Sequence, residues 1–443
     1  MNIPHLIFGK GRTPLRPFVF LLLFSCAIAH ARPVRVTLLH FSDYHSHAVP
    51  FYDDGRAGVG GIARAAGYLR QEKKRGALIF SGGDMINRGS PAWSDKYQCA
   101  EWPWLNGLVD AMAFGNHDAD YGHDAFDRCR AQLRYPILSA NTQGMQRTAV
   151  LTVKGVRIGV FAVAGPDFPS LVKAEGFTFA DRIAAARDAV RALREGEHAD
   201  AVVMIGHEHI DDDFALARAV PGIDLIFGTH SHLKRELTRI EGTSTWFISP
   251  FQYLAYVSRV ELTVDDGKVT RVDGKLVRVD DKLPIDRAID QRVRTMQREL
   301  EHDPQYAALF APIAKLPEAV SVEALAKRTV EIMRRAAKAD VAVSTASSFR
   351  QALPPGTLTL EALCAAMPYD NEIVVAEMTG AQFEALLVAP GADGPFVVAR
   401  PDSIEPSARY RVAMTDYLAG LAKIQAVKSG LRVRNEVRIS FAP

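Results

Sequence analysis

A dense run of polar residues at the end of an apolar segment restricts the fold of this chain more than any other feature. The apolar run 111–114 is followed directly by Gly-Asn-His-Asp-Ala-Asp-Tyr-Gly at 115–122, and then by a stretch with helical periodicity. Polar groups at this density are costly to bury in an apolar core, so we expect them to face a ligand, a metal ion or water. We therefore interpret this segment as the centre of a functional site.

Four further polar clusters follow short apolar runs in the same way. They lie at 40–47, 81–84, 206–209 and 228–232. Short apolar strands separated by helices are typical of buried strands in an α/β sheet. Open α/β sheets bind their ligands at the carboxyl ends of the strands, and all five clusters occupy that position.

The residue types in these clusters favour a pair of divalent metal ions. Oxygen and imidazole ligands without a cysteine cluster indicate Mn, Zn, Fe or a similar ion rather than an iron–sulfur or structural zinc site. Two such ions about 3.5–4 Å apart can hold a hydroxide between them for in-line attack. Asp84 is the natural bridge, because each of its carboxylate oxygens can serve one ion. A single histidine at a strand end is more often a surface residue, but five clusters in series outweigh that interpretation.

The order of the motifs carries a resemblance to a known family. Asp-x-His, Gly-Asp, Gly-Asn-His-Asp, Gly-His and Gly-x-His-x-His, from Asp43 to His232, resemble the calcineurin-like metallophosphoesterases. Tyr-Gly at 121–122 and Leu-Ser-Ala-Asn at 138–141 are similar to the exported bacterial 5′-nucleotidase and UDP-sugar hydrolase branch. The resemblance covers nearly all of the chain after residue 31. It implies a four-layer α/β/β/α metallophosphoesterase domain, joined by a helix to a second, smaller α/β substrate-binding domain.

The resemblance also implies the roles of the site residues. One metal ion would be held by Asp43, His45, Asp84 and His232, and the other by Asp84, Asn116, His207 and His230. His117 would act on the leaving group and the phosphate, oriented by Asp120. An imidazolium held by a carboxylate can protonate or stabilise a departing alkoxide near neutral pH. His47 and His209 are additional histidines, which we interpret as lying behind the ligands or on the surface.

The expected substrate contacts depart from the family pattern. The family's substrate loop is Asn-x-Gly-Gly-x-Arg, whereas residues 345–350 are Thr-Ala-Ser-Ser-Phe-Arg. Arg350 is retained and can clamp a phosphate through two hydrogen bonds, and Asn116 is also expected to contact the substrate. Gly-Leu-Ala-Lys-Ile at 420–424 replaces the family's terminal Gly-Gly-Asp-Gly-aromatic segment, whose aromatic ring would stack on the base. Phe396 is then the candidate to stack on one face of a nucleotide base. The nucleotide preference is therefore open, whereas the metal ligands are unaffected.

The length of 443 residues predicts more than one domain. We expect a signal peptide at 1–31, a metallophosphoesterase domain at 32–282, a linker helix at 283–304 and a 5′-nucleotidase-type C-terminal domain at 305–443. A β-hairpin at 257–277 should turn at Asp266 and Gly267.

The first residues of the chain resemble an export signal. Three basic side chains precede an uncharged apolar run at 18–29, and Ala-His-Ala at 29–31 predicts cleavage after Ala31. The apolar run is shorter than the roughly 20 residues that span a bilayer. We therefore expect a periplasmic or secreted protein. A lipid on Cys26 is the alternative, although Phe24 is bulky for such a site.

The charge balance excludes some partners. Without residues 1–31, which hold three basic and no acidic side chains, the formal net charge falls from +2 to −1. A nearly neutral chain gives no electrostatic basis for binding nucleic acid or, after cleavage, a membrane. We expect a small phosphoester, foremost a nucleotide, as the substrate and a monomeric protein. Export permits disulfides, so Cys99 and Cys129 either pair or stay free, and Cys364 is left as a buried thiol.

Three functions remain open at this point. The leading one is an exported two-metal phosphoester hydrolase of the 5′-nucleotidase type. A second keeps both metals and hydrolyses another bond, such as a sulfur ester or a thiosulfonate on a carrier. The third is a periplasmic binding protein that uses metal only structurally. His117 and Asp120 favour the enzymes, because binding alone does not need that pair.

Overall fold

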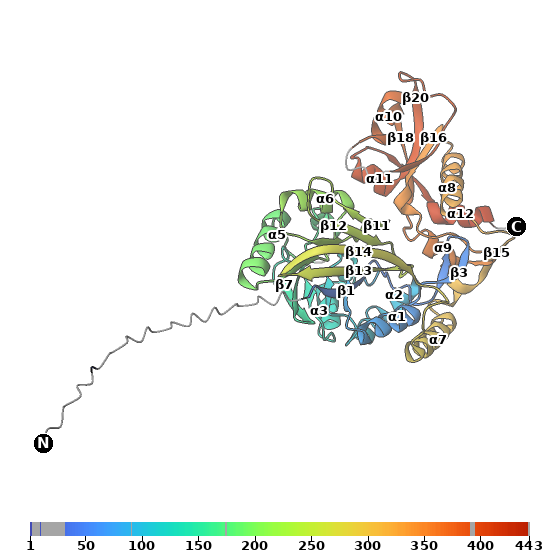
Figure 1. Ribbon diagram of the computed structural model, residues 1–443. Helices are drawn as coiled ribbons and strands as arrows, with labels where there is room; N and C mark the ends of the chain where they lie inside the picture. Colours follow the sequence, from blue (N-terminus) through green and yellow to red (C-terminus); the bar gives the residue numbers. More distant parts are fainter. Residues whose placement is uncertain (2–8, 10–31, 90, 173–174, 390–394, 442–443) are drawn as a thin grey trace. The chain divides into compact units, whose positions relative to one another are not determined.

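The computed structural model describes residues 1, 9, 32–89, 91–172, 175–389 and 395–441. Met1–Arg32 and Pro33–Pro443 are separate units, and every helix and strand of the described residues belongs to the second unit (Figure 1). The predicted signal sequence, with its cleavage after Ala31 and the alternative of a lipid on Cys26, lies outside the described residues apart from Met1 and Gly9. Within the described ranges, each helix is too short or too polar to cross a bilayer.

The first sheet has the strand order β14-β13-β1-β4-β5-β6. Its strands are β1 (Val34–Phe41), β4 (Leu78–Ser81), β5 (Ala111–Ala113), β6 (Ile137–Leu138), β13 (Tyr256–Asp265) and β14 (Lys268–Arg278). The strands β1, β4, β5 and β6 are parallel, whereas β13 pairs antiparallel with both β1 and β14. Because parallel strands end at the same edge, the polar loops after β1, β4 and β5 leave the sheet side by side.

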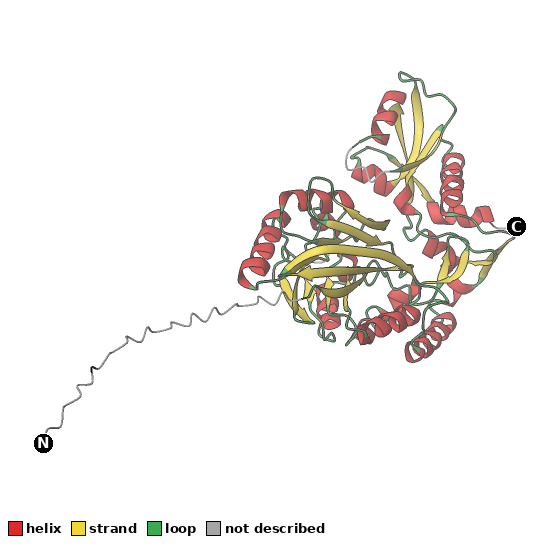
Figure 2. Cartoon of the chain, viewed as in Figure 1, coloured by secondary structure: helices red, strands yellow, loops and turns green. Residues whose placement is uncertain are grey.

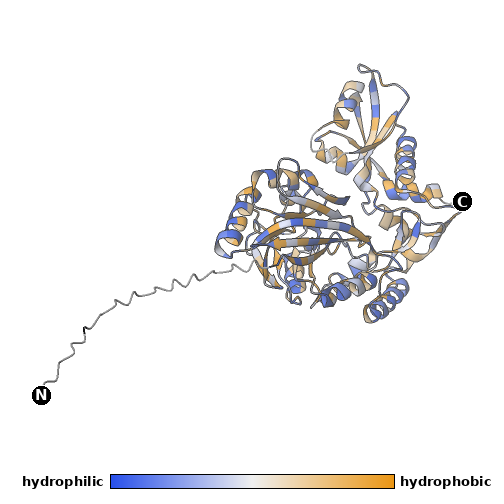
Figure 3. Cartoon of the chain, viewed as in Figure 1, coloured by the Kyte–Doolittle hydropathy of each residue, from blue (hydrophilic) through white to orange (hydrophobic). Residues whose placement is uncertain are grey.

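The hairpin of β13 and β14 confirms the predicted turn. Asp266 and Gly267 connect the two strands with φ of 47° and 69°, the left-handed backbone that a two-residue hairpin turn requires. Along β13, buried residues alternate with half-buried ones from Ser258 onward, and Figure 3 shows the matching alternation in hydropathy on this hairpin. One face of the hairpin therefore belongs to the core.

The second sheet has the strand order β11-β12-β10-β9-β8-β7. Its strands are β7 (Thr148–Val153), β8 (Val156–Phe161), β9 (Ala201–Met204), β10 (Leu225–Phe227), β11 (Lys234–Arg239) and β12 (Trp246–Pro250). The strands β8, β9, β10 and β12 are parallel. The polar clusters at 206–209 and 228–232 therefore follow adjacent strands at one edge of this sheet.

Helices cover the outer face of each sheet, which gives four layers in the order α/β/β/α (Figure 2). Leu38 and Phe80 of the first sheet pack against Val203 and Phe227 of the second. Helices α1 (Ile62–Lys74) and α3 (His123–Arg130) pack on the first sheet, and α5 (Arg182–Arg191) and α6 (Ile210–Ala219) pack on the second. The expected four-layer metallophosphoesterase fold is confirmed.

A smaller α/β part follows the helix α7 (Arg287–His302). Its five-stranded sheet has the order β19-β16-β20-β18-β21. The strands are β16 (Val341–Thr345), β18 (Glu372–Thr379), β19 (Phe396–Ala399), β20 (Arg409–Thr415) and β21 (Val427–Arg432). They are accompanied by α8 (Val322–Ala336), α9 (Leu360–Ala366), α10 (Gly380–Leu387), α11 (Asp416–Leu421) and α12 (Val433–Phe441). The domain limits at 32–282, 283–304 and 305–443 stay a prediction.

Short elements and one disulfide complete the architecture. The short strands are β2 (Phe51–Asp53), β3 (Arg56–Val59), β15 (Pro312–Leu316) and β17 (Gly356–Thr359). The short helices are α2 (Ala92–Tyr97), α4 (Phe168–Leu171) and five single turns, η1 (Trp102–Leu105), η2 (Asn116–Ala119), η3 (Ala192–Gly196), η4 (Ala307–Phe310) and η5 (Ala346–Ser348). Of the two alternatives for Cys99 and Cys129, the structure shows the disulfide, and Cys364 is a buried free thiol.

Candidate metal centre

The loops at the carboxyl ends of five strands carry the predicted metal ligands. Five of these ligands have left-handed backbones with φ between 49° and 52°, namely Asp43, His45, Asp84, His230 and His232. A non-glycine residue in this region costs about 1–3 kcal/mol, and such strain persists where the surrounding structure demands it, often at functional sites. The backbone therefore holds these side chains in place at a cost to stability.

Glycine at position 115 allows two of these loops to meet. A Cβ at this position would overlap the backbone and the carboxylate of Asp84. The loop after β4 can therefore lie against the loop after β5 only if residue 115 has no side chain. This close approach explains why glycine precedes asparagine and histidine in the central motif.

Asp43, His45 and His232 form the first group of ligand atoms. Nε2 of His232 lies 3.1 Å from Oδ1 of Asp43 and 3.1 Å from Nε2 of His45. The side chains of Asp43 and His45 are fully or almost fully buried, and that of His232 is 11% exposed. Neighbouring ligands of a tetrahedral ion lie about 3.4 Å apart when the bonds are about 2.1 Å long. The first group thus has the spacing of a metal site.

Asp84, His207 and His230 form the second group, in which the ligand atoms lie within 4.8 Å of one another. Nε2 of His207 lies 3.2 Å from Oδ2 of Asp84. Asn116, which was predicted to complete this group, is buried, and its Oδ1 has no hydrogen-bond partner in the described part of the chain. A buried amide oxygen without a partner is costly, and a cation is a partner that would satisfy it. The residues present therefore fit a divalent ion.

Asp84 lies between the two groups. Its Oδ2 is 3.2 Å from Nε2 of His207 and 3.7 Å from Nε2 of His45, whereas its Oδ1 accepts the backbone N–H of His117 at 2.8 Å. From the sequence, each of its two oxygens was expected to serve one ion. In the structure Oδ2 alone faces both groups, because Oδ1 accepts the backbone N–H of His117.

Backbone carbonyls hold the outer nitrogens of two ligand rings. Nδ1 of His45 lies 3.2 Å from the carbonyl oxygen of Ile86, and Nδ1 of His207 lies 2.7 Å from that of Gly82. A carbonyl only accepts, so Nδ1 of each ring carries a proton, and Nε2 is the nitrogen that can face an ion. Burial lowers the pKa of His45 to about 3, which keeps this ring neutral.

Asp118 ties the loop after β4 to the loop after β5. Its carboxylate accepts the backbone N–H groups of Asp84 at 3.2 Å, Met85 at 2.7 Å and Gly115 at 2.8 Å. No role was predicted for this residue from the sequence, and its place inside the central motif was the available signal.

His117 and Asp120 stand beside the first group. Nδ1 of His117 donates to Oδ2 of Asp120 at 2.8 Å, and each side chain is 22% exposed. The same carboxylate oxygen accepts the backbone N–H of Arg88 at 2.9 Å, which fixes its position. Although burial lowers the pKa of His117, the carboxylates of Asp84 and Asp120 raise it to about 10. The ring can therefore donate a proton at neutral pH.

Arg350 reaches the first group from the C-terminal part. Its Nη1 contacts Nδ1 of His232, and its Nη2 donates to the hydroxyl of Tyr369 at 3.1 Å. The carbonyl oxygen of Arg350 accepts from Nε2 of Gln252 at 3.2 Å. Phe396 is half-buried in β19, where it pairs with Thr345 at the start of the segment that ends in Arg350.

Further side chains without a predicted ligand role surround the ligands. Asp167, which follows β8, lies with Oδ2 2.9 Å from Nε2 of His230 and 3.4 Å from Nε2 of His209. His47 is buried and stacks on Tyr253, with 3.6 Å between the ring centroids, which agrees with its placement behind the ligands. The position of Asp167 after a strand of the second sheet was the only sequence signal for it.

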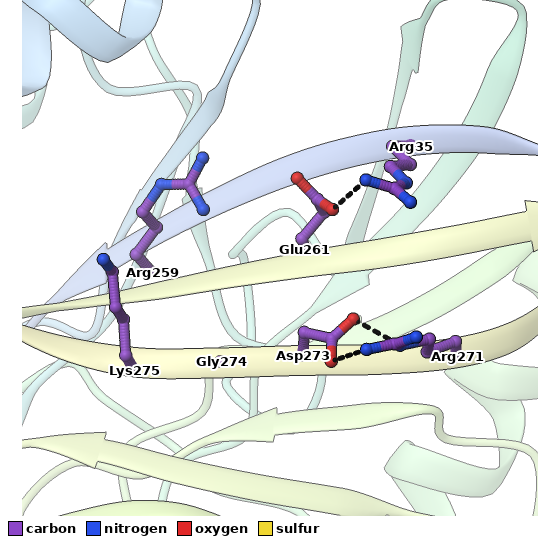
Figure 4. Close-up of a pocket in the computed structure, with 7 residues that line it drawn as sticks. All are labelled: Arg35, Arg259, Glu261, Arg271, Asp273, Gly274 and Lys275. Atoms are coloured by element: carbon purple, nitrogen blue, oxygen red, sulfur yellow. Dashed lines mark hydrogen bonds and ion pairs between the residues drawn. The ribbon is translucent and has the colours of Figure 1, made fainter.

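A shallow depression on the first sheet lies apart from these groups. It is lined by charged residues of β1, β13 and β14 (Figure 4). Arg35 pairs with Glu261 at 3.6 Å, and Arg271 pairs with Asp273 at 2.7 Å. The depression contains none of the candidate ligands, so it is not part of the centre.

Two protein families match this chain. The calcineurin-like phosphoesterase family matches residues 36–234, and the C-terminal domain of 5′-nucleotidases matches residues 319–400. Protein UshA of Yersinia enterocolitica is 25% identical over 421 residues, which cover 80% of this chain and 75% of that protein. The 5′-nucleotidase of Bos taurus is 29% identical over 51% of this chain and 42% of its own length.

Solved structures share the fold. The 5′-nucleotidase precursor of Thermus thermophilus superimposes with a TM-score of 0.73 at 20% identity, over 92% of this chain and 96% of that one. The sulfate thiohydrolase SoxB of Thermus thermophilus superimposes with a TM-score of 0.72 at 19% identity, over 92% and 94% of the two chains. The same two-part architecture therefore occurs in proteins that bear different names for their activity.

Proposed function

We propose that this chain, which combines a calcineurin-like phosphoesterase domain with a 5′-nucleotidase C-terminal domain, is an exported hydrolase of phosphate esters that uses two divalent metal ions. One observation carries the proposal. Two groups of ligand atoms meet at Oδ2 of Asp84, and the hydrogen-bonded pair of His117 and Asp120 lies beside them.

The ligand sets follow from the two groups. Asp43, His45, Asp84 and His232 would hold one ion, and Asp84, Asn116, His207 and His230 would hold the other. When bound, the ions would supply Lewis acidity toward phosphoryl oxygens and a hydroxide nucleophile at neutral pH. The identity of the ions is open among those that accept oxygen and imidazole ligands, such as Mn, Zn and Fe.

His117 would serve the leaving group rather than an ion. Its Nδ1–H is committed to Asp120, so Nε2 is the nitrogen that can deliver a proton to the departing alkoxide. Asp120 holds the ring in that tautomer and offsets the charge of the imidazolium. The partial exposure of both side chains supports this role, because a substrate must reach the ring.

Arg350 would bind the phosphate. Its guanidinium lies against His232 of the first group, although it belongs to the C-terminal part. Arginine presents paired N–H donors to a phosphate, so a substrate at the ions would meet it directly. Phe396 would be the candidate contact for a base, because its strand pairs with the segment that positions Arg350.

A nucleotide is the leading substrate, and a sulfur ester or thiosulfonate is the second candidate. The relatives named 5′-nucleotidase favour the first. The second is favoured by Thr-Ala-Ser-Ser-Phe-Arg at 345–350, which lacks the asparagine and glycines of the nucleotidase loop, and by the likeness to the sulfate thiohydrolase.

Export is supported by the disulfide. Disulfides persist in the periplasm and outside the cell and are rare in the cytosol. The Cys99–Cys129 bond therefore agrees with the signal sequence predicted for residues 1–31.

Hydrolysis of a substrate panel tests the proposal. The purified protein is assayed with 5′-nucleotides, sugar phosphates, a simple aryl phosphate and a thiosulfonate, in the presence of Mn²⁺ or Zn²⁺. We expect phosphate release from nucleotides, abolished by a chelator and restored by the metal ion. Hydrolysis of the thiosulfonate alone would replace the first candidate by the second. Binding without turnover of every compound would contradict an enzymatic function.

A further inference from the structure

His230 belongs to a third cluster of ligand atoms that the proposed function does not use. The ring is a member of the second group with Asp84 and His207. Its Nε2 lies 2.9 Å from Oδ2 of Asp167, and the same oxygen lies 3.4 Å from Nε2 of His209. The two rings lie 4.3 Å apart between centroids.

The spacing of this cluster matches that of the two proposed metal groups. Its nitrogen–oxygen contacts are 2.9 and 3.4 Å long. The corresponding contacts are 3.1 Å in the first group, between His232 and Asp43, and 3.2 Å in the second, between His207 and Asp84. About 3.4 Å separates neighbouring ligands of a tetrahedral ion with bonds of about 2.1 Å. Two imidazoles and one carboxylate are a donor set that suits Zn²⁺.

The cluster is open to solvent, unlike the first two groups. The side chain of His209 is 47% exposed and that of Asp167 is 27% exposed. An ion can therefore reach the three ligands from solution and keep a water molecule as its fourth ligand.

An orienting hydrogen bond is the simpler explanation for part of this geometry. Asp167 can accept the Nε2–H of His230, which leaves Nδ1 for the ion of the second group. That explanation accounts for the contact between Asp167 and His230. It gives no reason for His209 to place a second imidazole on the same carboxylate oxygen.

We propose that Asp167, His209 and His230 form a third divalent-cation site, at which excess Zn²⁺ binds and inhibits the enzyme. The inhibitory effect rests on the proposed function, since it requires a working second group. A neutral imidazole has one free lone pair. An ion on Nε2 of His230 therefore either displaces the Nε2 proton into solvent or draws the ring away from the second group. Both events disturb the second group, so the two sites compete for His230.

A zinc titration of matched variants tests this site. Wild type, His209→Gln and the control His198→Gln are loaded with their ions and then exposed to increasing free Zn²⁺, with Mg²⁺ as the comparison ion. His209 is chosen because its side chain makes no helix-capping hydrogen bond, and His198 is an exposed histidine outside all three groups. Bound zinc is measured by equilibrium dialysis, and phosphate release is measured with one phosphomonoester.

We expect wild type to bind one additional, weaker zinc over the concentration range in which its activity falls. Loss of one of three protein ligands should raise the zinc concentration for binding and for inhibition by roughly 10-fold or more in His209→Gln, with basal activity kept. His198→Gln should match wild type, and Mg²⁺ should not inhibit, because it prefers oxygen ligands.

Equal zinc binding and equal inhibition in wild type and His209→Gln would overturn the third site and leave the contact of Asp167 and His230 as an orienting hydrogen bond. A wild-type protein that hydrolyses no phosphoester would overturn the proposed function instead. In that case the difference in bound zinc between wild type and His209→Gln would still decide the third site.

Discussion

Glu101 should make the stability of this protein fall as the pH rises through the weakly acidic range. Its side chain is buried beneath the first ligand loop, where Oε1 accepts from the hydroxyl of Tyr44 at 3.0 Å and from Nε1 of Trp93 at 2.6 Å. Oε2 has no hydrogen-bond partner among the residues that the structure describes. Burial raises the pKa of Glu101 from 4.5 to about 7, and the hydrogen bonds from its own backbone N–H, Tyr44 and Trp93 only partly oppose this.

The size and sign of the effect follow from this pKa. Between pH 4.5 and about 7 the unfolded chain releases the proton while the folded chain keeps it, so the free energy of unfolding decreases as the pH rises. The difference between a pKa of 4.5 in the unfolded chain and about 7 in the folded one corresponds to about 3 kcal/mol. Glu101→Gln removes the titration and keeps an oxygen that can accept from Tyr44 and Trp93. Its amide group then stands unpaired in place of Oε2, at a cost of about 1–3 kcal/mol that does not change with pH.

Urea unfolding of wild type and Glu101→Gln near pH 4.5 and near pH 8 measures the effect. From pH 4.5 to pH 8, the free energy of unfolding of the variant should rise by about 3 kcal/mol relative to that of the wild type. Glu241→Gln, at an exposed glutamate, is the control and should differ from wild type equally at both conditions. A constant difference between wild type and Glu101→Gln would refute the reasoning, because it would mean that Glu101 is ionised in the folded protein.

Three further predictions concern catalysis and stability. His117→Asn should keep its metal content while its kcat falls by about 10²–10⁴-fold, and the kcat of Asp120→Asn should fall less because the imidazole remains. Kinetics with one phosphomonoester and elemental analysis of the two variants check both. Arg350→Ala should mainly raise KM, since a phosphate clamp binds ground and transition states alike, and an unchanged KM would show that Arg350 does not bind the phosphate. Replacing Cys99 and Cys129 by serine should lower the free energy of unfolding by about 3–4 kcal/mol, measured in urea.

The sequence predicted the fold and the ligand candidates because both depend on local patterns. Each polar cluster directly follows an apolar run, and parallel strands necessarily end at one edge of a sheet. Asp266 and Gly267 predicted their turn because few residue pairs adopt that backbone.

Features that depend on contacts between distant segments were not predictable in this way. Asp167 meets His230 across 63 residues, and no motif marks it. The pairing of Cys99 with Cys129 remained one of two alternatives, because spacing alone does not bring two sulfurs together. The single oxygen of Asp84 that faces both ligand groups depends on where the N–H of His117 lies.

The metal content of Asp84→Ala tests the central claim most directly, because that claim is a pair of ions that share one carboxylate. Elemental analysis of the wild type should find about two divalent ions per chain. Asp84→Ala should lose both ions together, whereas His232→Ala should lose mainly one. An Asp84→Ala protein that keeps two ions, or a wild type that is metal-free and fully active, would contradict the account.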